Sequence, residues 1–178
     1  MIETQIPKEV YYHRENLINS CDGRRVDALT ITHNSRIDRN CEASPEGLYP
    51  DKGERARRFN KPVVVISARV HPGETPASYM CNGFINFLIG PDPRAEVLRE
   101  EFLFKIIPFL NPDGVYRGHW RTDTFGVNLN RSYINPDREK APTIFALCEL
   151  VKVHQEKIYA YIDLHAHPNK RGMFMFGN

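Results

Sequence analysis

The chain has 178 residues, of which 41% are hydrophobic, and a formal net charge of +2. This length predicts one domain with enough apolar side chains for a core. The small net charge gives no reason to expect nucleic acid or a membrane as partner, and no apolar run approaches the ~18 residues of a membrane-spanning helix. The four cysteines are widely spread and form no Cys-x-x-Cys, which favours reduced thiols in the cytoplasm.

The chain opens with a predicted hairpin. Residues 11–18 and 25–32 have strand composition and flank a Cys-Asp-Gly turn. Residues 33–60 are polar and poor in apolar side chains. Because so long a connection without periodicity is either functional or disordered, low order is predicted there.

Apolar strands then alternate with helical patterns. The predicted elements are a buried strand over residues 62–69, a helix over 76–88, a second helix that begins near Pro93, a strand over 102–109, a helix over 142–156 and a strand over 158–164. This alternation predicts an α/β domain with a mixed, mostly parallel sheet flanked by helices.

Histidine and glutamate follow the ends of two of these strands. His71 and Glu74 come directly after the strand at 62–69, and His165 and His167 come after the strand at 158–164. Two histidines and one glutamate are the ligand set of a catalytic zinc site that keeps its fourth position open for water. Taken alone, His-x-x-Glu is more often a capped turn with a surface glutamate than a metal site.

An arginine-rich loop lies between the two ligand clusters. Residues 116–133 carry Arg117, Arg121 and Arg131 among asparagines and aromatics, without helical or strand periodicity. Guanidinium groups suit the recognition of carboxylates and the stabilisation of a developing oxyanion. A zinc site followed by such a loop indicates acyl-transfer chemistry on a substrate with a free carboxylate.

Five motifs occur in a fixed order: His-Pro-Gly-Glu-Thr-Pro at 71–76, Asn-Pro-Asp-Gly-Val at 111–115, Arg121, Gly-Val-Asn-Leu-Asn-Arg at 126–131 and Asp-Leu-His-Ala-His at 163–167. With them the chain resembles the zinc metallocarboxypeptidases of the carboxypeptidase A type. It is most similar to the cytosolic carboxypeptidases, which trim glutamate from tubulin, and among them to the member that removes branch-point glutamates. The resemblance covers almost the whole chain except residues 34–60.

The resemblance implies a role for each motif. His71, Glu74 and His165 are expected to hold one Zn²⁺ ion, and Arg121 to polarise the scissile carbonyl. The pair Asn130–Arg131 is expected to bind the terminal carboxylate of the substrate.

Asn128 and His167 also lie within these motifs. Asn128 stands where the secreted digestive enzymes have an aspartate behind the first zinc histidine, so a negative charge that would raise the basicity of the ligand is missing. Strand alternation places His165 and His167 on the same side and leaves both open as ligands. Because His165 is nearer the buried strand and His167 precedes a proline, which favours a loop-like conformation, His165 is the predicted ligand.

The same resemblance predicts which parts of the family's catalytic domain this sequence contains. The general-base glutamate of the family is expected downstream of Asn178. Residues 1–33 are expected to be the start of the catalytic domain with the end of a preceding β domain, residues 34–60 a flexible insertion, and residues 61–178 the N-terminal half of the catalytic domain. A chain of this extent alone is expected to be inactive.

The implied activity is hydrolysis of C-terminal or branch-point glutamate from polyglutamylated proteins such as tubulin. The implied location is the cytosol, with association to the cytoskeleton or nucleus left open. Two alternatives remain at this point: a zinc N-acyl-amino-acid deacylase of the aspartoacylase type, and a non-catalytic fragment that binds zinc or a peptide tail.

Overall fold

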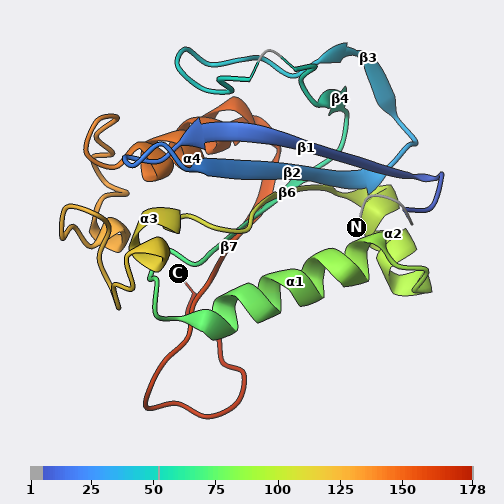
Figure 1. Ribbon diagram of the computed structural model, residues 1–178. Helices are drawn as coiled ribbons and strands as arrows, with labels where there is room; N and C mark the ends of the chain where they lie inside the picture. The colour runs from blue at the N-terminus through green and yellow to red at the C-terminus, as the bar shows by residue number, and fades with distance from the viewer. Residues whose placement is uncertain (1–5, 52, 178) are drawn as a thin grey trace.

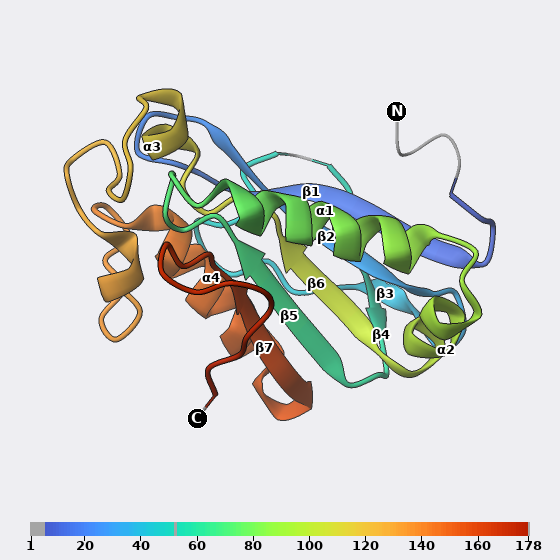
Figure 2. The same ribbon diagram turned by 90° about the horizontal axis from the view of Figure 1, so that it is seen from below.

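The computed structural model describes residues 6–51 and 53–177. Residues 1–5, which begin the predicted region 1–33, therefore lie outside the described part. Its main sheet has five strands in the order β1-β2-β6-β5-β7 (Figures 1 and 2). The strands are β1 Val10–Asn19, β2 Arg25–His33, β5 Val63–Ala68, β6 Leu103–Ile107 and β7 Ile158–Leu164. Strand β2 is antiparallel to β1 and to β6, whereas β5 is parallel to both of its neighbours, β6 and β7. The predicted mixed sheet is confirmed.

A tight turn joins β1 to β2, as the sequence predicts. Gly23 adopts a φ of 78°, a left-handed conformation that glycine accepts without steric cost. The turn is closed by backbone hydrogen bonds from Gly23 N to the Ser20 carbonyl at 2.9 Å and from Ser20 N to the Arg24 carbonyl at 2.8 Å. A one-residue irregularity between Asn16 and Ile18 bends β1 within the pair.

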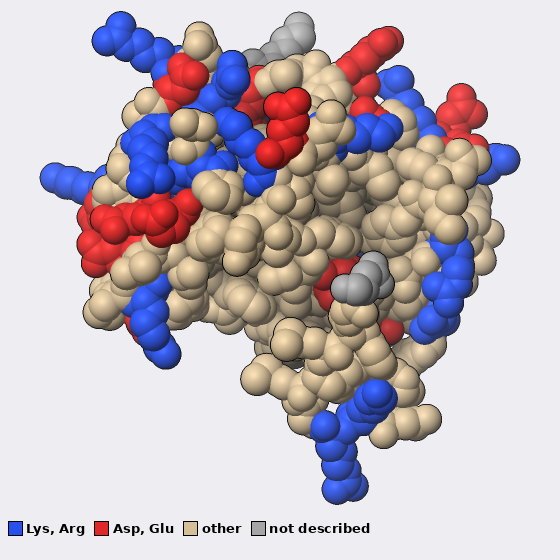
Figure 3. All heavy atoms as spheres, turned by 180° about the vertical axis from the view of Figure 1, so that it is seen from behind, with Lys and Arg blue, Asp and Glu red and all other residues tan. Residues whose placement is uncertain are grey.

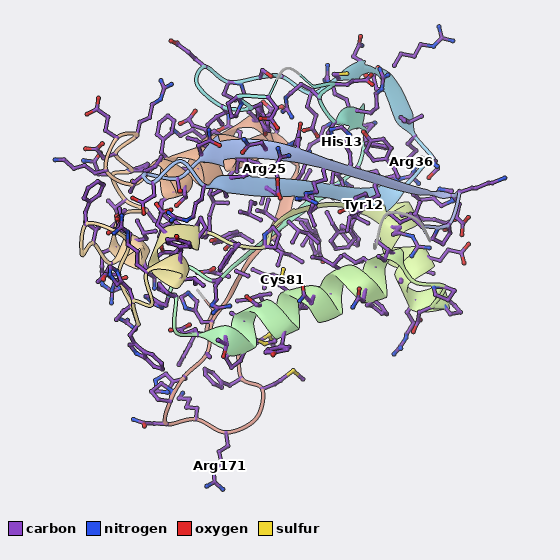
Figure 4. The ribbon with its side chains drawn as sticks, in the orientation of Figure 1. Tyr12, His13, Arg25, Arg36, Cys81 and Arg171 are labelled. Atoms are coloured by element: carbon purple, nitrogen blue, oxygen red, sulfur yellow. The ribbon has the colours of Figure 1, made fainter. Side chains whose placement is uncertain are left out.

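Helices cover both faces of the sheet. Helices α1 (Thr75–Ile89) and α2 (Pro93–Glu101) lie on one face, and α4 (Pro142–Val153) lies on the other (Figures 1 and 2). The buried residues of α1 recur every three or four positions, and Cys81 points from this helix toward the sheet (Figure 4). Sequence periodicity therefore located these helices to within a few residues; α4 ends at Val153 rather than at residue 156.

Strand β5 lies at the centre of this core. All six of its residues are buried. Val63 and Val65 pack into the cluster that includes α4, whereas Val64 and Ile66 pack into the cluster that includes α1. Burial on both faces explains why this strand is a continuous apolar run rather than an alternating pattern.

Residues 34–60 contain regular structure, contrary to the predicted structureless connection. Strands β3 (Ile37–Cys41) and β4 (Arg57–Phe59) form a second, two-stranded sheet. A buried ion pair between the Glu42 carboxylate and Lys105 of β6, 2.5 Å apart, ties the segment to the main sheet. Residues 34–60 are thus attached to the main sheet partly through polar side chains. Their low apolar content therefore gave no sign of this attachment.

Periodicity did not reveal two short helices, one directly before the arginine-rich loop and one within it. Helix α3 spans Pro112–Tyr116, and a 3-10 turn spans Leu129–Arg131. Helices this short show less than two turns of pattern, so their signal lies in caps such as Asn111, whose side chain accepts a hydrogen bond from Gly114 N.

Strand β7 lies at one edge of the sheet, and β1 lies at the opposite edge (Figure 2). Its Tyr159, Tyr161 and Ile162 side chains are exposed. The side of the molecule turned away in Figure 1 shows a broad area without charged side chains (Figure 3). After β7 the chain forms a loop from which Arg171 extends away from the body of the molecule (Figure 4). Within the described residues no helix is long and apolar enough to cross a membrane.

Candidate metal centre

The first ligand loop is folded tightly against α1. Directly after β5, Arg69 adopts a φ of 60° and turns the chain. Its guanidinium donates hydrogen bonds to the Pro72 carbonyl at 2.8 Å and to the Ser78 hydroxyl at 2.7 Å. Because α1 begins at Thr75, these bonds fix His71 and Glu74 between a buried strand and the first turn of a helix.

Two glycines allow this loop to approach the arginine-rich segment. A Cβ atom on Gly73 would lie 2.4 Å from the Trp120 ring, and one on Gly114 would lie 2.4 Å from Pro72 Cγ. Gly73 N also donates a hydrogen bond to the Trp120 carbonyl at 2.8 Å. The His-Pro-Gly-Glu motif is therefore packed against the loop that carries Arg121.

Glu74 lies between the two predicted histidine ligands. Its Oε1 is 2.8 Å from His71 Nδ1, and its Oε2 is 3.0 Å from His165 Nδ1. Oε2 also accepts a hydrogen bond from the Ala166 backbone amide at 2.8 Å. One ligand atom from each of the three side chains lies within 4.8 Å of the others.

The far nitrogen of each imidazole has its own acceptor. His71 Nε2 is 3.1 Å from Asn128 Oδ1, and His165 Nε2 is 2.6 Å from Asp163 Oδ2. If each Nε2 carries the proton, both Nδ1 lone pairs point toward Glu74. This is the arrangement that metal-bound histidines show, so the residues fit a zinc ion with three protein ligands and one open position.

The electrostatics of the cluster also suit a cation. Burial alone would raise the pKa of Glu74, but hydrogen bonds from His165 and His71 lower that pKa well below its usual range. Hydrogen bonds to Asp163 and Glu74 raise the pKa of His165 to about 9. Without a metal, a proton on His165 therefore balances part of the negative charge that a divalent ion would neutralise when bound.

The structure brings one predicted arginine to the centre. Arg121 Nη1 lies 4.0 Å from Glu74 Oε1, and its side chain is 48% exposed. The backbone amide of Asn130 donates to Asn128 Oδ1 at 3.1 Å, which connects it to His71. The Arg131 guanidinium is exposed and donates to the Asn130 carbonyl, so the described contacts place it near the loop rather than at Glu74.

His167 lies outside the cluster of ligand atoms in the described chain. Its Nδ1 accepts a hydrogen bond from Asn169 N at 3.2 Å, and its ring packs against Phe174. This geometry supports the choice of His165 as the ligand.

Sequence reasoning missed two buried aspartates that hold the site. Asp123 Oδ1 accepts hydrogen bonds from Phe125 N and Val127 N, which shapes the turn before Asn128. Asp113 accepts from the Ser20 hydroxyl at 2.6 Å and from Arg24, which joins the β1–β2 turn to α3. An aspartate that begins a Gly-containing turn is the signal that could have revealed Asp123.

The family model that describes zinc carboxypeptidases matches residues 10–169. The chain belongs to the zinc carboxypeptidase family. Human "cytosolic carboxypeptidase-like protein 5" is 53% identical over 150 residues, which cover 82% of this chain and 17% of that protein. Mouse "cytosolic carboxypeptidase 6" is 41% identical over 172 residues, which cover 94% of this chain and 28% of that protein.

A solved structure confirms the fold. The metallo-carboxypeptidase of Burkholderia cenocepacia superposes with a TM-score of 0.69 at 29% identity and covers 92% of this chain and 38% of that one. The chain thus spans less than a third of the two curated relatives named above. The family match favours the peptidase over the deacylase alternative.

Proposed function

We propose that the protein is a zinc-dependent metallocarboxypeptidase that removes glutamate from the ends or branch points of polyglutamylated protein tails. One observation carries the proposal: His71, Glu74 and His165 converge from two strand ends, with Arg121 beside them. The similarity to cytosolic carboxypeptidases supports both a protein substrate and a cytosolic location. Tubulin tails are the acidic substrate that we infer from this similarity.

The roles of the ligand residues follow from their contacts. His71, Glu74 and His165 would hold the zinc ion. When bound, zinc supplies a Lewis acid that polarises the carbonyl and lowers the pKa of its bound water from about 15.7 toward ~7. Asn128 Oδ1 and Asp163 Oδ2 lie beside the Nε2 atoms of the two imidazoles, so that each Nδ1 faces the Glu74 carboxylate.

The arginines would act on the substrate. Arg121 is close enough to Glu74 to donate a hydrogen bond to a carbonyl oxygen at the centre, where it would stabilise the charge that develops in the transition state. Asn130 and Arg131 would hold the free carboxylate, which confines cleavage to the last residue.

Peptide hydrolysis by the full-length gene product tests the proposal. We expect chelator-sensitive release of glutamate from a peptide that ends in several glutamates, and no release from the same peptide with an amidated carboxyl terminus. Zinc-loaded protein that cleaves both peptides at equal rates, or neither, would contradict the carboxypeptidase assignment.

Two variants separate the roles of the arginines. Arg121→Ala should lower kcat by about 100- to 1000-fold, because the oxyanion exists only in the transition state. Arg131→Ala should mainly raise KM, because the carboxylate contact exists before the reaction as well. Arg94→Ala, an exposed arginine on α2, is the matched control and should change neither constant.

A further inference from the structure

Asp163 lies at the centre of a chain of short hydrogen bonds that ends at the metal centre. Its Oδ1 accepts a hydrogen bond from the Ser67 hydroxyl at 2.6 Å, and its Oδ2 is 2.6 Å from His165 Nε2. The opposite nitrogen of that imidazole, Nδ1, is 3.0 Å from Glu74 Oε2. This series of hydrogen bonds therefore runs from β5 through β7 to the Glu74 carboxylate, which contacts both His71 and His165.

Ser67 anchors this series of hydrogen bonds in a buried strand. It is fully buried in β5, and it pairs with Asp163 in the parallel register of β5 and β7. Its hydroxyl is also 2.8 Å from the Tyr161 hydroxyl. Because the register places the two side chains next to each other, the Asp163 carboxylate is held by a strand whose residues are all buried.

His165 needs such support more than His71 does. The His71 side chain is 3% exposed, whereas that of His165 is 31% exposed. His165 follows an edge strand, so fewer neighbours restrict rotation of its ring. A hydrogen bond to one imidazole nitrogen fixes the orientation of the other, which is the nitrogen that a metal would use.

We propose that Asp163, held in place by Ser67, is a positioning residue that turns His165 Nδ1 toward the metal. The inference rests on the proposed zinc centre and adds two residues of this chain to it. An incidental surface ion pair is the competing explanation. Surface pairs of that kind contribute little and lack a buried anchor such as Ser67.

Metal binding by two variants of Asp163 tests this role. Asp163→Ala removes both hydrogen bonds. Asp163→Asn keeps the shape and removes the negative charge. Its amide oxygen can still accept from His165, and its NH₂ group can donate to the Ser67 hydroxyl, which then accepts where it donated before. Asp92→Asn, at the N-terminus of α2 and at the other end of α1, is the matched control (Figure 1).

The measurements are the zinc affinity, from competition with a chelator at fixed pH, and the visible absorption spectrum of the Co²⁺-substituted protein. We expect Asp163→Ala to weaken zinc binding by about 10- to 100-fold and to change the Co²⁺ spectrum. Asp163→Asn should lose affinity by a smaller factor and keep the spectrum, and Asp92→Asn should match the unmutated protein.

The outcomes separate the positioning role from a purely structural one. Circular dichroism shows which variants are folded, and a variant that is only less stable would have a lower Tm with unchanged zinc affinity below it. Such a result, or an Asp163→Ala affinity within twofold of the unmutated value, overturns the proposal. If Asp163→Ala does not fold, an Asp163→Asn affinity equal to that of Asp92→Asn overturns it instead. An unmutated protein that binds no zinc overturns the metal centre itself, and the role of Asp163 with it.

Discussion

Strands β5 and β7 lie side by side and each leads to one histidine ligand, but they hold their ligands in different ways. Every residue of β5 is buried, and the strand has a neighbour on both sides. Strand β7 pairs only with β5 among the described strands and exposes three of its larger side chains. His71 therefore combines its hydrogen bonds with nearly complete burial, whereas the more exposed His165 relies mainly on hydrogen bonds to Asp163 and Glu74.

This difference shows how a metal site can be built at the border of a core. One ligand loop is fixed by packing, which tolerates little movement. The other depends on a few charged contacts, each of which can be removed without opening a cavity. Substitutions in each half can therefore separate the contribution of packing from that of charged contacts.

Glu74→Ala should have the largest effect, because this carboxylate contacts both histidines and is itself a proposed ligand. We expect zinc affinity to fall by more than about 100-fold, beyond the loss typical for residues that only support a ligand. Metal competition assays measure it. Glu96→Ala serves as the control, since Glu96 belongs to α2, which lies near the C-terminal end of α1, whereas Glu74 directly precedes the first turn of α1 (Figure 1). Tight zinc binding by Glu74→Ala would rule out its role as a ligand.

The two strands should differ in their contribution to stability. Ile66 of β5 is 1% exposed and Ile162 of β7 is 37% exposed. Ile66→Ala should lower the free energy of unfolding by about 2–5 kcal/mol, because it removes buried methyl groups and leaves a cavity. Ile162→Ala should lower it by less than about 1 kcal/mol. Urea denaturation compares them, and equal losses would show that β7 is as well packed as β5.

The stability of the protein should decrease in acid because of His154, which lies in the connection from α4 to β7. Burial, with the positive charges of Lys105 and Lys157, lowers the pKa of His154 to about 3, so His154 is neutral in the folded protein. As pH falls below about 6.5, His154 binds a proton in the unfolded chain but not in the folded chain. The free energy of unfolding therefore decreases. The loss should approach about 1.4 kcal/mol per pH unit.

Denaturation of His154→Gln between pH 5 and 6.5 checks this expectation. The variant should show a flatter dependence of stability on pH than the unmutated protein. Parallel curves for the two proteins would mean that another group causes the acid sensitivity.

Asn128→Asp should have the smallest effect and would make the two histidines more alike. His71 Nε2 would then face a carboxylate, as His165 Nε2 already does. The added charge should raise the basicity of His71 and strengthen zinc binding by a few-fold, less than about tenfold. Weaker zinc binding by this variant would show that the amide is needed for the geometry of the turn.

Sequence patterns predicted the features that are determined by residues close together in the sequence. The apolar run of β5, the spacing of α1 and the turn at Gly23 all appear where the sequence indicates them. The motifs likewise pointed to His71, Glu74 and Arg121, which the structure brings together.

The remaining features depend on contacts between distant residues. Nothing near Glu42 in the sequence indicates that its partner is Lys105, 63 residues away, so residues 34–60 appeared structureless. Asp163 is two residues from His165, but its anchor Ser67 lies 96 residues from it in the sequence, on the neighbouring strand. Only the strand register of β5 and β7 places these two side chains together.

The contact between Gly73 and Trp120 has an optical consequence. Trp120 is the single tryptophan of the chain, its ring covers the glycine of the first ligand loop, and most of the ring faces solvent. Indole emission responds to local polarity and to nearby quenching groups. The intrinsic fluorescence of the unlabelled protein therefore arises from one known position beside the proposed centre. Movement of that loop during metal or peptide binding can be followed in solution, in real time and without an attached dye.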